Sequence, residues 1–491
     1  MDQFEQVRVE KLKKIESLGF DAYPTSYRYT HTLRLLSEEF SGQTSEDLEA
    51  APEKVRVAGR VVASRPFGKA GFLTLYEGGG KIQVYVRKDN LAEKDFQLYK
   101  LLDIGDFVGV EGTMFRTRTG ELTVQVAELT FLSKGLLPLP EKWHGLTDVE
   151  IRYRRRYLDL IVNEGVRDVF VKRNLIVREM RKFLDERGYL EVETPILHPI
   201  AGGALARPFI TQHNALDMPF YLRVAPELYL KRLIVGGLTR VYDLNRSFRN
   251  EGVSIKHNPE YTMLEFYEAY SNYSDLMNLT EEMLTNLVEK VCGSHRITYG
   301  EQQIDFSNWQ RLTVKEAIVK YYPNDIREAD LEERVSTLKL LDGVNAEYDS
   351  SISLGNLIGE LFDNVAEKHL VQPTFVYDYP VELSPLSKVK KSDPRLVERF
   401  ELFIAGMEIA NAYSEVNDPV DQHNRFNSQL VAIESGDEEA HAMDDDYVRA
   451  LAYGMPPTAG EGIGIDRLTM LLTDSRSIRD VILFPHLRLE E

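Results

Sequence analysis

The stretch SFRNEGVSIKHNPEYTMLEFYEAY, residues 247–270, consists of two strand-like runs joined by a loop, and both runs alternate polar and apolar side chains. Successive side chains of a strand point to opposite faces, so Arg249 and Glu251 lie opposite Phe248. If the runs pair as an antiparallel hairpin, one face packs into a core and the other is a polar platform. The first run extends back to Val241, so the platform carries Asp243, Asn245, Ser247, Arg249 and Glu251 from the first run and Tyr261, Met263, Glu265 and Tyr267 from the second.

Charges on such a platform need an explanation, because burying an unpaired charge costs several kcal/mol. The platform is therefore either an ordinary solvent-facing sheet surface or a site for a charged ligand. The hairpin alone leaves both interpretations open.

Composition and charge narrow the class of protein. The chain has 491 residues, 43% of them hydrophobic and 28% charged, which excludes a disordered or fibrous chain and leaves room for roughly two to four domains. No apolar run approaches the ~18 residues of a membrane span, and the charged start lacks the apolar core of a signal peptide. We therefore expect a cytoplasmic protein with no membrane partner.

Cysteine content and net charge limit the metals and partners. Cys292 is the only cysteine, so we expect neither an intrachain disulfide nor a cysteine-rich zinc site. Oxygen ligands or His would have to hold any metal, which favours magnesium together with phosphates. The net charge of −19 argues against a diffuse nucleic-acid-binding surface.

A local exception to the acidic average lies near the N-terminus. Residues 55–132 form short alternating runs separated by Gly and charged turns, which predicts a small barrel of about five strands. Between residues 55 and 90, seven Lys or Arg oppose two acidic residues, a local charge of +5. Cations with aromatics suit the stacking of single-stranded bases, although the same aromatics could form the barrel core. The aromatic residues in question are Phe67, Phe72, Tyr76 and Tyr85.

The Pro-containing segment 139–149 is the expected linker between an N-terminal domain, 1–138, and a C-terminal domain, 150–491. In the larger domain, strands follow one another through hairpins and helices come in blocks between them. This order predicts an α+β fold and not a doubly wound parallel sheet.

Two further segments of the larger domain carry candidate site residues. In ELFIAGMEIANAYSE, 401–415, the polar side chains of Asn411, Tyr413 and Glu415 can share one strand face. The carboxylates of Glu401 and Glu408, seven residues apart, either flank a magnesium ion or form a solvated acidic edge. In TAGEGIGIDRLTMLL, 458–472, a glycine-rich entry to a helix suits close approach of a ligand to the backbone, with Arg467 facing an anion. This second segment lacks the Gly-Lys-Ser/Thr of a phosphate-binding loop.

In this order the motifs resemble those of class II aminoacyl-tRNA synthetases, and most closely the bacterial-type lysyl-tRNA synthetases. RNLIVREMRKFLDERGYLEVETPIL (173–197), FRNEGVSIKHNPEYTMLE (248–265) and GEGIGIDRLTMLL (460–472) resemble the three motifs of the class. The segments at 202–237 and 406–419 resemble the lysine branch. The resemblance covers the chain from about residue 5 to its end.

The resemblance implies a six-stranded antiparallel catalytic sheet, an N-terminal OB-fold that binds the anticodon, and a homodimer formed through the first motif. The implied reaction is ATP-dependent ligation of L-lysine to tRNA(Lys) through lysyl-adenylate, with release of pyrophosphate and AMP. Magnesium is the implied cofactor, held by Glu401 and Glu408, and no zinc is expected.

The resemblance also assigns roles around ATP, with Arg249, Glu251 and Arg467 as the catalytic residues. Arg249 bridges the lysine carboxylate and the α-phosphate, which suits its planar fork of donors. Glu251 accepts from the adenine amino group, and Tyr261 stacks on the ring. The other implied nucleotide contacts are His257, Asn258, Glu401 and Arg467. Many relatives have Phe at the position of Tyr261, and some have Phe at the position of Tyr413. Both tyrosines keep an aromatic face.

The implied lysine pocket matches two ammonium groups with anions, whereas an aspartate pocket would need cations. Charge therefore disfavours the aspartyl- and asparaginyl-type alternatives. The implied lysine-binding residues are Gly203, Glu227, Arg249, Glu265, Tyr267, Asn411, Tyr413 and Glu415. The implied anticodon-binding residues are Arg65, Phe72 and Gln83, with Glu121 as a weaker candidate and Tyr76 and Tyr85 as structural residues.

Two other classes of protein remain as alternatives. A non-catalytic, synthetase-like RNA-binding protein would be expected to lack Arg249, Glu408 or Arg467, and all three are present. A paralogue that transfers lysine to an elongation factor resembles the catalytic domain but lacks the barrel, so residues 55–132 disfavour it.

Overall fold

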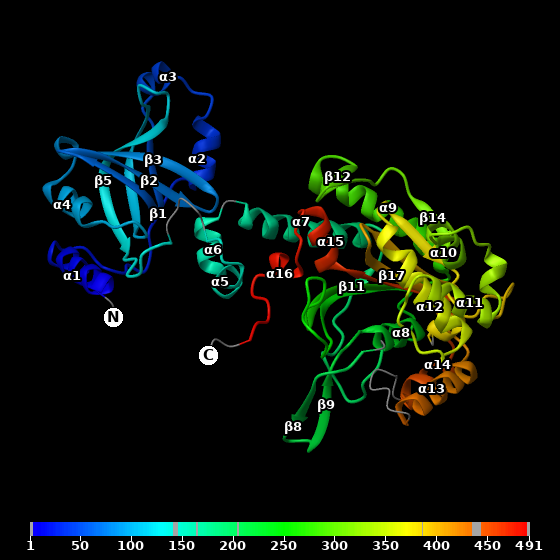
Figure 1. Ribbon diagram of the computed structural model, residues 1–491. Helices are drawn as coiled ribbons and strands as arrows, with labels where there is room; N and C mark the ends of the chain where they lie inside the picture. Colours follow the sequence, from blue (N-terminus) through cyan, green and yellow to red (C-terminus); the bar gives the residue numbers. More distant parts are fainter. Residues whose placement is uncertain are drawn as a thin grey trace. The chain divides into compact units, whose positions relative to one another are not determined.

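The computed structural model describes residues 3–140, 146–163, 165–203, 206–384, 386–434 and 443–488. It divides into two compact units, Met1–Arg167 and Asp168–Glu491 (Figure 1). Residues 141–145 of the expected linker lie outside the described residues.

The first unit contains a closed five-stranded barrel, which confirms the prediction from the alternating runs. Its strands follow the order β1-β2-β3-β5-β4, with β3 and β5 parallel. Ile82, Val84 and Val86 of β3 are buried, while the intervening Gln83 and Tyr85 are half-exposed, because alternate side chains point into and out of the barrel. The strands are β1 (Lys54–Phe67), β2 (Ala70–Glu77), β3 (Gly80–Arg87), β4 (Phe107–Arg116) and β5 (Leu122–Ser133).

Short helices accompany this barrel. Leu33, Leu36 and Phe40 of α2 pack into the same hydrophobic core as the inward-facing strand residues. The helices are α1 (Gln3–Ser17), α2 (Leu33–Phe40), α3 (Ser45–Ala50), the 3-10 helix η1 (Lys88–Asn90), α4 (Glu93–Leu101), α5 (Val149–Arg154) and α6 (Arg156–Val162).

The second unit is built on an eight-stranded sheet of order β14-β15-β16-β17-β18-β11-β10-β6. The six central strands pair antiparallel, but β6 and β14 at the two edges pair parallel. The expectation of six strands, all antiparallel, is therefore wrong at the edges. β6 has two residues and β14 four, and their parallel pairing depends on partner strands more than 45 residues away in the chain. The strands are β6 (Leu190–Glu191), β10 (Arg240–Phe248), β11 (Glu260–Ala269), β14 (Gln310–Thr313), β15 (Thr374–Tyr377), β16 (Arg399–Ile404), β17 (Met407–Ser414) and β18 (Thr458–Gly464).

One face of this sheet packs into the largest core. Tyr242, Leu264 and Phe266 are fully buried there, as the alternation of residues 241–270 indicates. Helices α7, α9 and α15 contribute side chains to the same core, and Figure 1 shows α9 and α15 along that side of the sheet. These helices are α7 (Val166–Asp185), α9 (Tyr273–Cys292) and α15 (Ile465–Leu472). The opposite face is left for α8 (Glu227–Val235) and the site.

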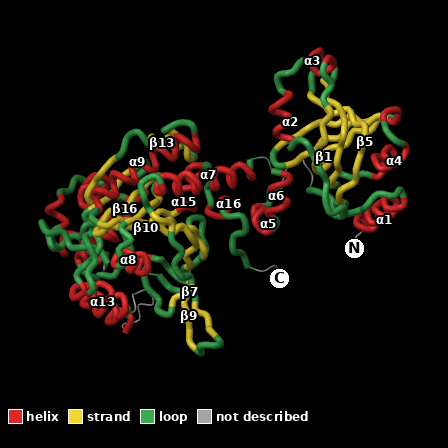
Figure 2. Tube along the Cα trace, turned by 180° about the vertical axis from the view of Figure 1, so that it is seen from behind, coloured by secondary structure: helices red, strands yellow, loops and turns green. Residues whose placement is uncertain are grey.

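The remaining elements surround the sheet. Strands β8 and β9 project from the rest of the unit as a hairpin (Figure 2), paired with β7 in a small sheet. Within the described residues, none of the helices combines the length and apolar character needed to cross a bilayer. The elements are β7 (Leu197–His198), β8 (Ile210–His213), β9 (Met218–Leu222), β12 (Arg296–Tyr299), β13 (Gln302–Asp305), α10 (Val314–Tyr321), η2 (Glu328–Leu331), α11 (Arg334–Gly343), α12 (Leu354–Val365), η3 (Glu367–His369), η4 (Val381–Leu383), α13 (Pro419–Glu434), α14 (Asp445–Ala452) and α16 (Ile478–Val481).

Candidate active site

Cross-strand pairing brings the candidate residues into two rows on one face of the large sheet. Partners in neighbouring strands point to the same side, so residues far apart in the sequence become neighbours. One row runs from β10 to β16 through Asp243, Glu265, Gly462, Asn411 and Glu401. The adjacent row runs through Val241, Tyr267, Gly460, Tyr413 and Arg399.

The centre of both rows is glycine. Gly460, Gly462 and Gly464 of β18 take the site face, whereas Ala459 and Ile463 lie in the core on the other side. A Cβ on Gly460 would lie 2.2 Å from a ring carbon of Tyr267 and 2.6 Å from Glu415 Oε1. The glycine-rich segment thus forms an open floor that side chains would fill.

A cavity lies over this floor and gathers most of the candidate residues from the sequence. The candidates that line it are Gly203, Glu227, Arg249, Glu251, His257, Asn258, Tyr261, Glu265, Tyr267, Glu408, Asn411, Tyr413 and Arg467. Glu401 and Glu415 are not among its lining residues.

Carboxylates and tyrosines form one part of the cavity wall. Tyr413 donates to Glu227 Oε1 at 2.7 Å, and Tyr267 donates to Glu265 Oε1 at 2.8 Å. Burial, together with the charge of Glu227, raises the pKa of Glu265 to about 8. Without a cationic ligand, Glu265 is therefore largely neutral at pH 7, and an ammonium group beside it would favour its ionised form.

A buried cation behind this wall was missed by the sequence interpretation. The ammonium of Lys231 on α8 is fully buried, donates to Glu227 Oε1 at 2.5 Å and pairs with Glu415 Oε2. The (i, i+4) spacing of Glu227 and Lys231 was a possible signal, although such pairs are usually found on solvent-exposed helix surfaces.

The part of the wall at Arg249 is suited to anions. The Arg249 guanidinium lies 5.3 Å from the ring centroid of Tyr261, whose hydroxyl donates to the Val224 carbonyl at 3.1 Å. Arg249 Nε is buried and has no hydrogen-bond partner among the described residues. A buried, unsatisfied donor is costly, so an anionic ligand here would remove a penalty as well as add a bond.

Arg467 and His257 close another side of the cavity. Arg467, in the first turn of α15, donates through Nη1 to the Glu408 carbonyl at 2.8 Å and to Glu408 Oε2 at 3.1 Å. Its Nη2 lies 3.2 Å from His257 Nε2. Burial and the neighbouring charge of Arg467 lower the pKa of His257, so this imidazole is neutral and accepts a hydrogen bond.

The second candidate carboxylate for magnesium, Glu401, lies beside Asn411 on the same sheet face and is held in a polar cluster. It accepts from Tyr379 at 2.8 Å and pairs with Arg399, which also donates to Asn411 Oδ1 at 3.0 Å. Burial raises the pKa of Glu401, with Arg399 opposing that rise and Glu408 adding to it. Arg399 was not singled out in the sequence, yet it connects the candidate pocket residue Asn411 with Glu401.

The chain matches known families over most of its length. A family model described as tRNA synthetases class II (D, K and N) matches residues 148–488, and one described as an OB-fold nucleic acid binding domain matches residues 55–132. The chain belongs to the class II tRNA synthetases. Its barrel coincides with the residues matched by the OB-fold model, and its large sheet lies within the residues matched by the synthetase model.

Relatives of this synthetase chain align over nearly all of it. A lysine–tRNA ligase of Moorella thermoacetica is 52% identical over 486 residues, which is 99% of this chain and 98% of the relative. Proteins with the same name from Halalkalibacterium halodurans (51% over 483 residues, 98% of this chain and 96% of the relative) and Carboxydothermus hydrogenoformans (50% over 489 residues, 99% and 98%) are similarly close.

The candidate anticodon-binding residues of the synthetase lie on the outer face of its barrel. Arg65 pairs with Phe72 across β1 and β2, and Phe72 pairs with Tyr85 across β2 and β3. The Phe72 and Tyr85 ring centroids are 4.9 Å apart. Gln83 donates to Glu121 at 2.9 Å.

Tyr85 thus shares the face of Phe72, although it was expected to be structural. The exposed Phe67 adds a third ring, with its centroid 5.6 Å from that of Phe72. The two-residue alternation of β3, which buries Val84 and Val86 and turns Tyr85 outward, was the signal that could have identified it.

Proposed function

We propose that the chain ligates lysine to tRNA in two steps, through a lysyl-adenylate. The observation that carries the proposal is one cavity lined both by an arginine, Arg249, and by two carboxylates, Glu227 and Glu265. Lysine and ATP together present anions and ammonium groups, which this wall complements. Relatives about 50% identical over nearly the whole chain are named lysine–tRNA ligase, and they support the same activity.

In the first step the lysine carboxylate attacks the α-phosphorus of ATP and pyrophosphate leaves. The nucleophile belongs to the substrate, so no protein base is needed and catalysis rests on positioning and charge neutralisation. Arg249 would hold the two approaching anions together with its planar fork of donors. In the second step a hydroxyl of the terminal tRNA adenosine, the 3′ one, takes the lysyl group and AMP leaves.

The nucleotide would be held by side chains from the hairpin and from α15. Tyr261 offers an aromatic face for the adenine, and Glu251 accepts from its amino group. His257, Asn258 and Arg467 line the same cavity and would contact the rest of the nucleotide. Hydrogen bonds to Glu408 and His257 hold the Arg467 side chain in one orientation before the nucleotide binds.

The lysine side of the cavity would be formed by Glu227, Glu265, Tyr267 and Asn411, with Gly203, Tyr413 and Glu415 around them. Two of these carboxylates line the cavity, and an aspartate side chain would meet repulsion there. The aspartyl- and asparaginyl-type alternatives are not supported, nor is the paralogue that lacks a barrel.

Magnesium fits the donor set of Glu401 and Glu408. Both are hard oxygen donors, and the charge of Glu408 contributes to the raised pKa of Glu401, so a cation between them would stabilise the pair. When bound, magnesium neutralises the phosphate oxygens of ATP. Arg399 and Tyr379 would keep the Glu401 carboxylate in one orientation.

The barrel would read the anticodon of tRNA(Lys). Phe72 would stack on a central base, while Arg65 and Gln83 supply a cation and an amide on the same face. A homodimer and a cytoplasmic location complete the proposal, and both rest on the family alone.

The test is lysine-dependent exchange of pyrophosphate into ATP across a panel of amino acids, followed by charging of tRNA(Lys). We expect lysine to support exchange far above the other amino acids, and Arg249→Ala to abolish it. Exchange that is no faster with lysine than with aspartate or asparagine would refute the proposal.

A further inference from the structure

A buried ammonium group lies behind the wall of the proposed lysine pocket. Lys231 lies on the second turn of α8, one turn after Glu227, and its side chain is fully buried. Its Nζ is 2.5 Å from Glu227 Oε1, is paired with Glu415 Oε2, and lies 5.5 Å from the ring centroid of Tyr413. The group is therefore held between two carboxylates and an aromatic face.

Lys231 is charged in this setting. Burial alone would lower the pKa of Lys231, but the carboxylates of Glu227 and Glu415 outweigh burial and raise it. Burial raises the pKa of Glu415 well above its ordinary value, although the charge of Lys231 opposes that rise. The titratable and charged groups around Lys231 are Glu227 and Arg232 of α8, Glu265 and Tyr267 of β11, Tyr413 of β17, Glu415 just after β17, and Tyr447 of α14.

The geometry also fixes the direction in which Glu227 acts. Glu227 Oε1 accepts from both Lys231 at 2.5 Å and Tyr413 at 2.7 Å. With this oxygen already accepting from Lys231 and Tyr413, Oε2 is left for a donor in the cavity that Glu227 lines. Lys231 itself is not among the lining residues, so it acts through Glu227 and Glu415.

We propose that Lys231 is a positioning residue for the amino-acid substrate: its buried ammonium holds the carboxylates of Glu227 and Glu415 in place and aims Glu227 at the ammonium of the incoming lysine. The proposal rests on the lysine pocket proposed above. The carboxylates of Glu227, Glu265 and Glu415 then share one internal cation, Lys231. The net negative charge that the substrate meets is therefore smaller than three carboxylates alone would give. Two unpaired carboxylates side by side would repel each other and take up protons.

The test is Lys231→Met, which keeps an unbranched apolar chain and removes the charge, with Lys231→Gln as a second neutral variant. We expect the KM for lysine in pyrophosphate exchange to rise at least about tenfold at pH 6.5, a factor that corresponds to one pKa unit. The rise should shrink as the pH increases to 8.5, because loss of the Lys231 charge favours the protonated form of neighbouring carboxylates and a higher pH disfavours it. The KM for ATP should stay unchanged.

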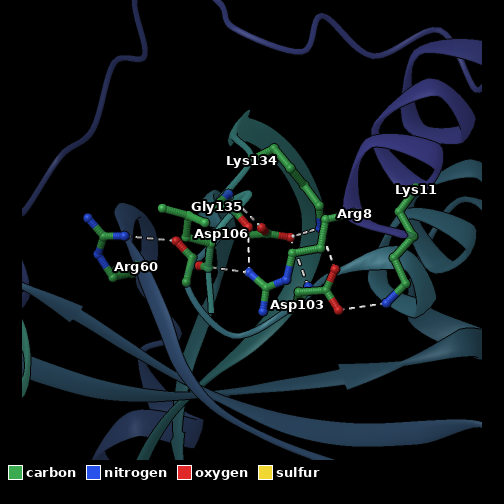
Figure 3. Close-up of polar contacts among 9 residues, drawn as sticks. Arg8, Lys11, Arg60, Asp103, Asp106, Lys134 and Gly135 are labelled. Carbon is green, nitrogen blue, oxygen red and sulfur yellow. Dashed lines mark hydrogen bonds and ion pairs between the residues drawn. The ribbon is translucent and has the colours of Figure 1, made fainter. Parts of the chain in front are cut away.

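The matched control is another buried lysine between two carboxylates, in the other unit. Lys134 has no exposed side-chain surface and lies 2.6 Å from Asp103 Oδ2 and 2.8 Å from Asp106 Oδ2 (Figure 3). Lys134→Met should lower the thermal unfolding temperature and leave the lysine KM and its pH dependence unaltered.

Three results would overturn the proposal: an unchanged lysine KM in the folded Lys231 variants, an increase that is the same at every pH, or failure of both variants to fold. Glu265→Gln separates this failure from failure of the pocket itself. If Glu265→Gln raises the lysine KM and Lys231→Met does not, only the role of Lys231 is wrong. If neither substitution changes the KM, the proposed lysine pocket is wrong.

Discussion

A single methyl group added to the cavity floor should block the reaction while the fold stays intact. Gly462 lies in β18 between Glu265 of β11 and Asn411 of β17. In Gly462→Ala the new Cβ would lie 3.3 Å from Met263 Sδ, its nearest contact, and this atom belongs to a flexible side chain that can yield by a few tenths of an ångström. In contrast, the Cβ of Gly460→Ala would lie 2.2 Å from the Tyr267 ring.

The magnitudes follow from these contacts. Gly462→Ala gains about 0.4–1 kcal/mol from a less flexible unfolded chain, and moving Met263 costs a similar amount, so stability should change by less than about 1 kcal/mol. A substrate resting on the floor would be displaced by about 1 Å, which is enough to cost roughly 100-fold in rate, or about 2.7 kcal/mol. Gly460→Ala should instead destabilise the fold itself.

The assay is kcat/KM for lysine-dependent pyrophosphate exchange, measured beside thermal unfolding. Gly42→Ala, where a Cβ would meet nothing within 4 Å, controls for a Gly-to-Ala change in the other unit. A folded Gly462→Ala protein with activity within about twofold of the parent would refute the idea that β18 is the floor under the substrates.

Three further predictions concern protonation and the barrel. Because the pKa of Glu265 is about 8 before lysine arrives, lysine binding at pH 7 should release about one proton, seen by calorimetry in buffers of different ionisation enthalpy; equal heats in all buffers would contradict this. Phe72→Ala should leave pyrophosphate exchange intact and lower tRNA charging by about 5- to 150-fold, the value of one base stack, whereas equal loss of both steps would argue against an anticodon role. Glu461 is buried, accepts a hydrogen bond from Thr280 and has a pKa of about 8. The folded state therefore keeps a proton that the unfolded state loses near pH 4.5, and the stability of the fold decreases as the pH rises from 4.5 to 8. Glu461→Gln lacks this pH-dependent loss, so its unfolding free energy relative to the parent protein should increase by about 3 kcal/mol between pH 5 and pH 8, measured by urea unfolding. Unfolding free energies of the two proteins that change in parallel with pH would contradict this prediction.

The hairpin at the centre of the site could be predicted from the sequence because its alternation is regular. Leu264 and Phe266 read as core and are fully buried, while Glu265 and Tyr267 read as platform and line the cavity. The two-residue hydrophobic period determines which face of the hairpin is buried. The face on which a residue lies then determines which residues of the neighbouring strands it can contact.

What the sequence could not supply depends on partners distant in the chain. Lys231 in ELYLKRL has the appearance of an ordinary helix-surface lysine, and only the approach of Glu415 makes it a buried cation. The role of Arg399 likewise becomes visible only in the structure, where it contacts both Asn411 and Glu401. The spacing of Glu401 and Glu408 in the sequence does not show that Glu408 lines the cavity while Glu401 is held by Tyr379 and Arg399.

Whether lysine and ATP meet over β18 is decided by a crystal structure of the chain with lysine and a non-hydrolysable ATP analogue. We predict a lysine ammonium within hydrogen-bond distance of Glu227 and Glu265, and both the lysine carboxylate and the α-phosphate on Arg249. A lysine bound outside this cavity, or with its carboxylate beside Glu265 and an ammonium beside Arg249, would contradict the proposed site.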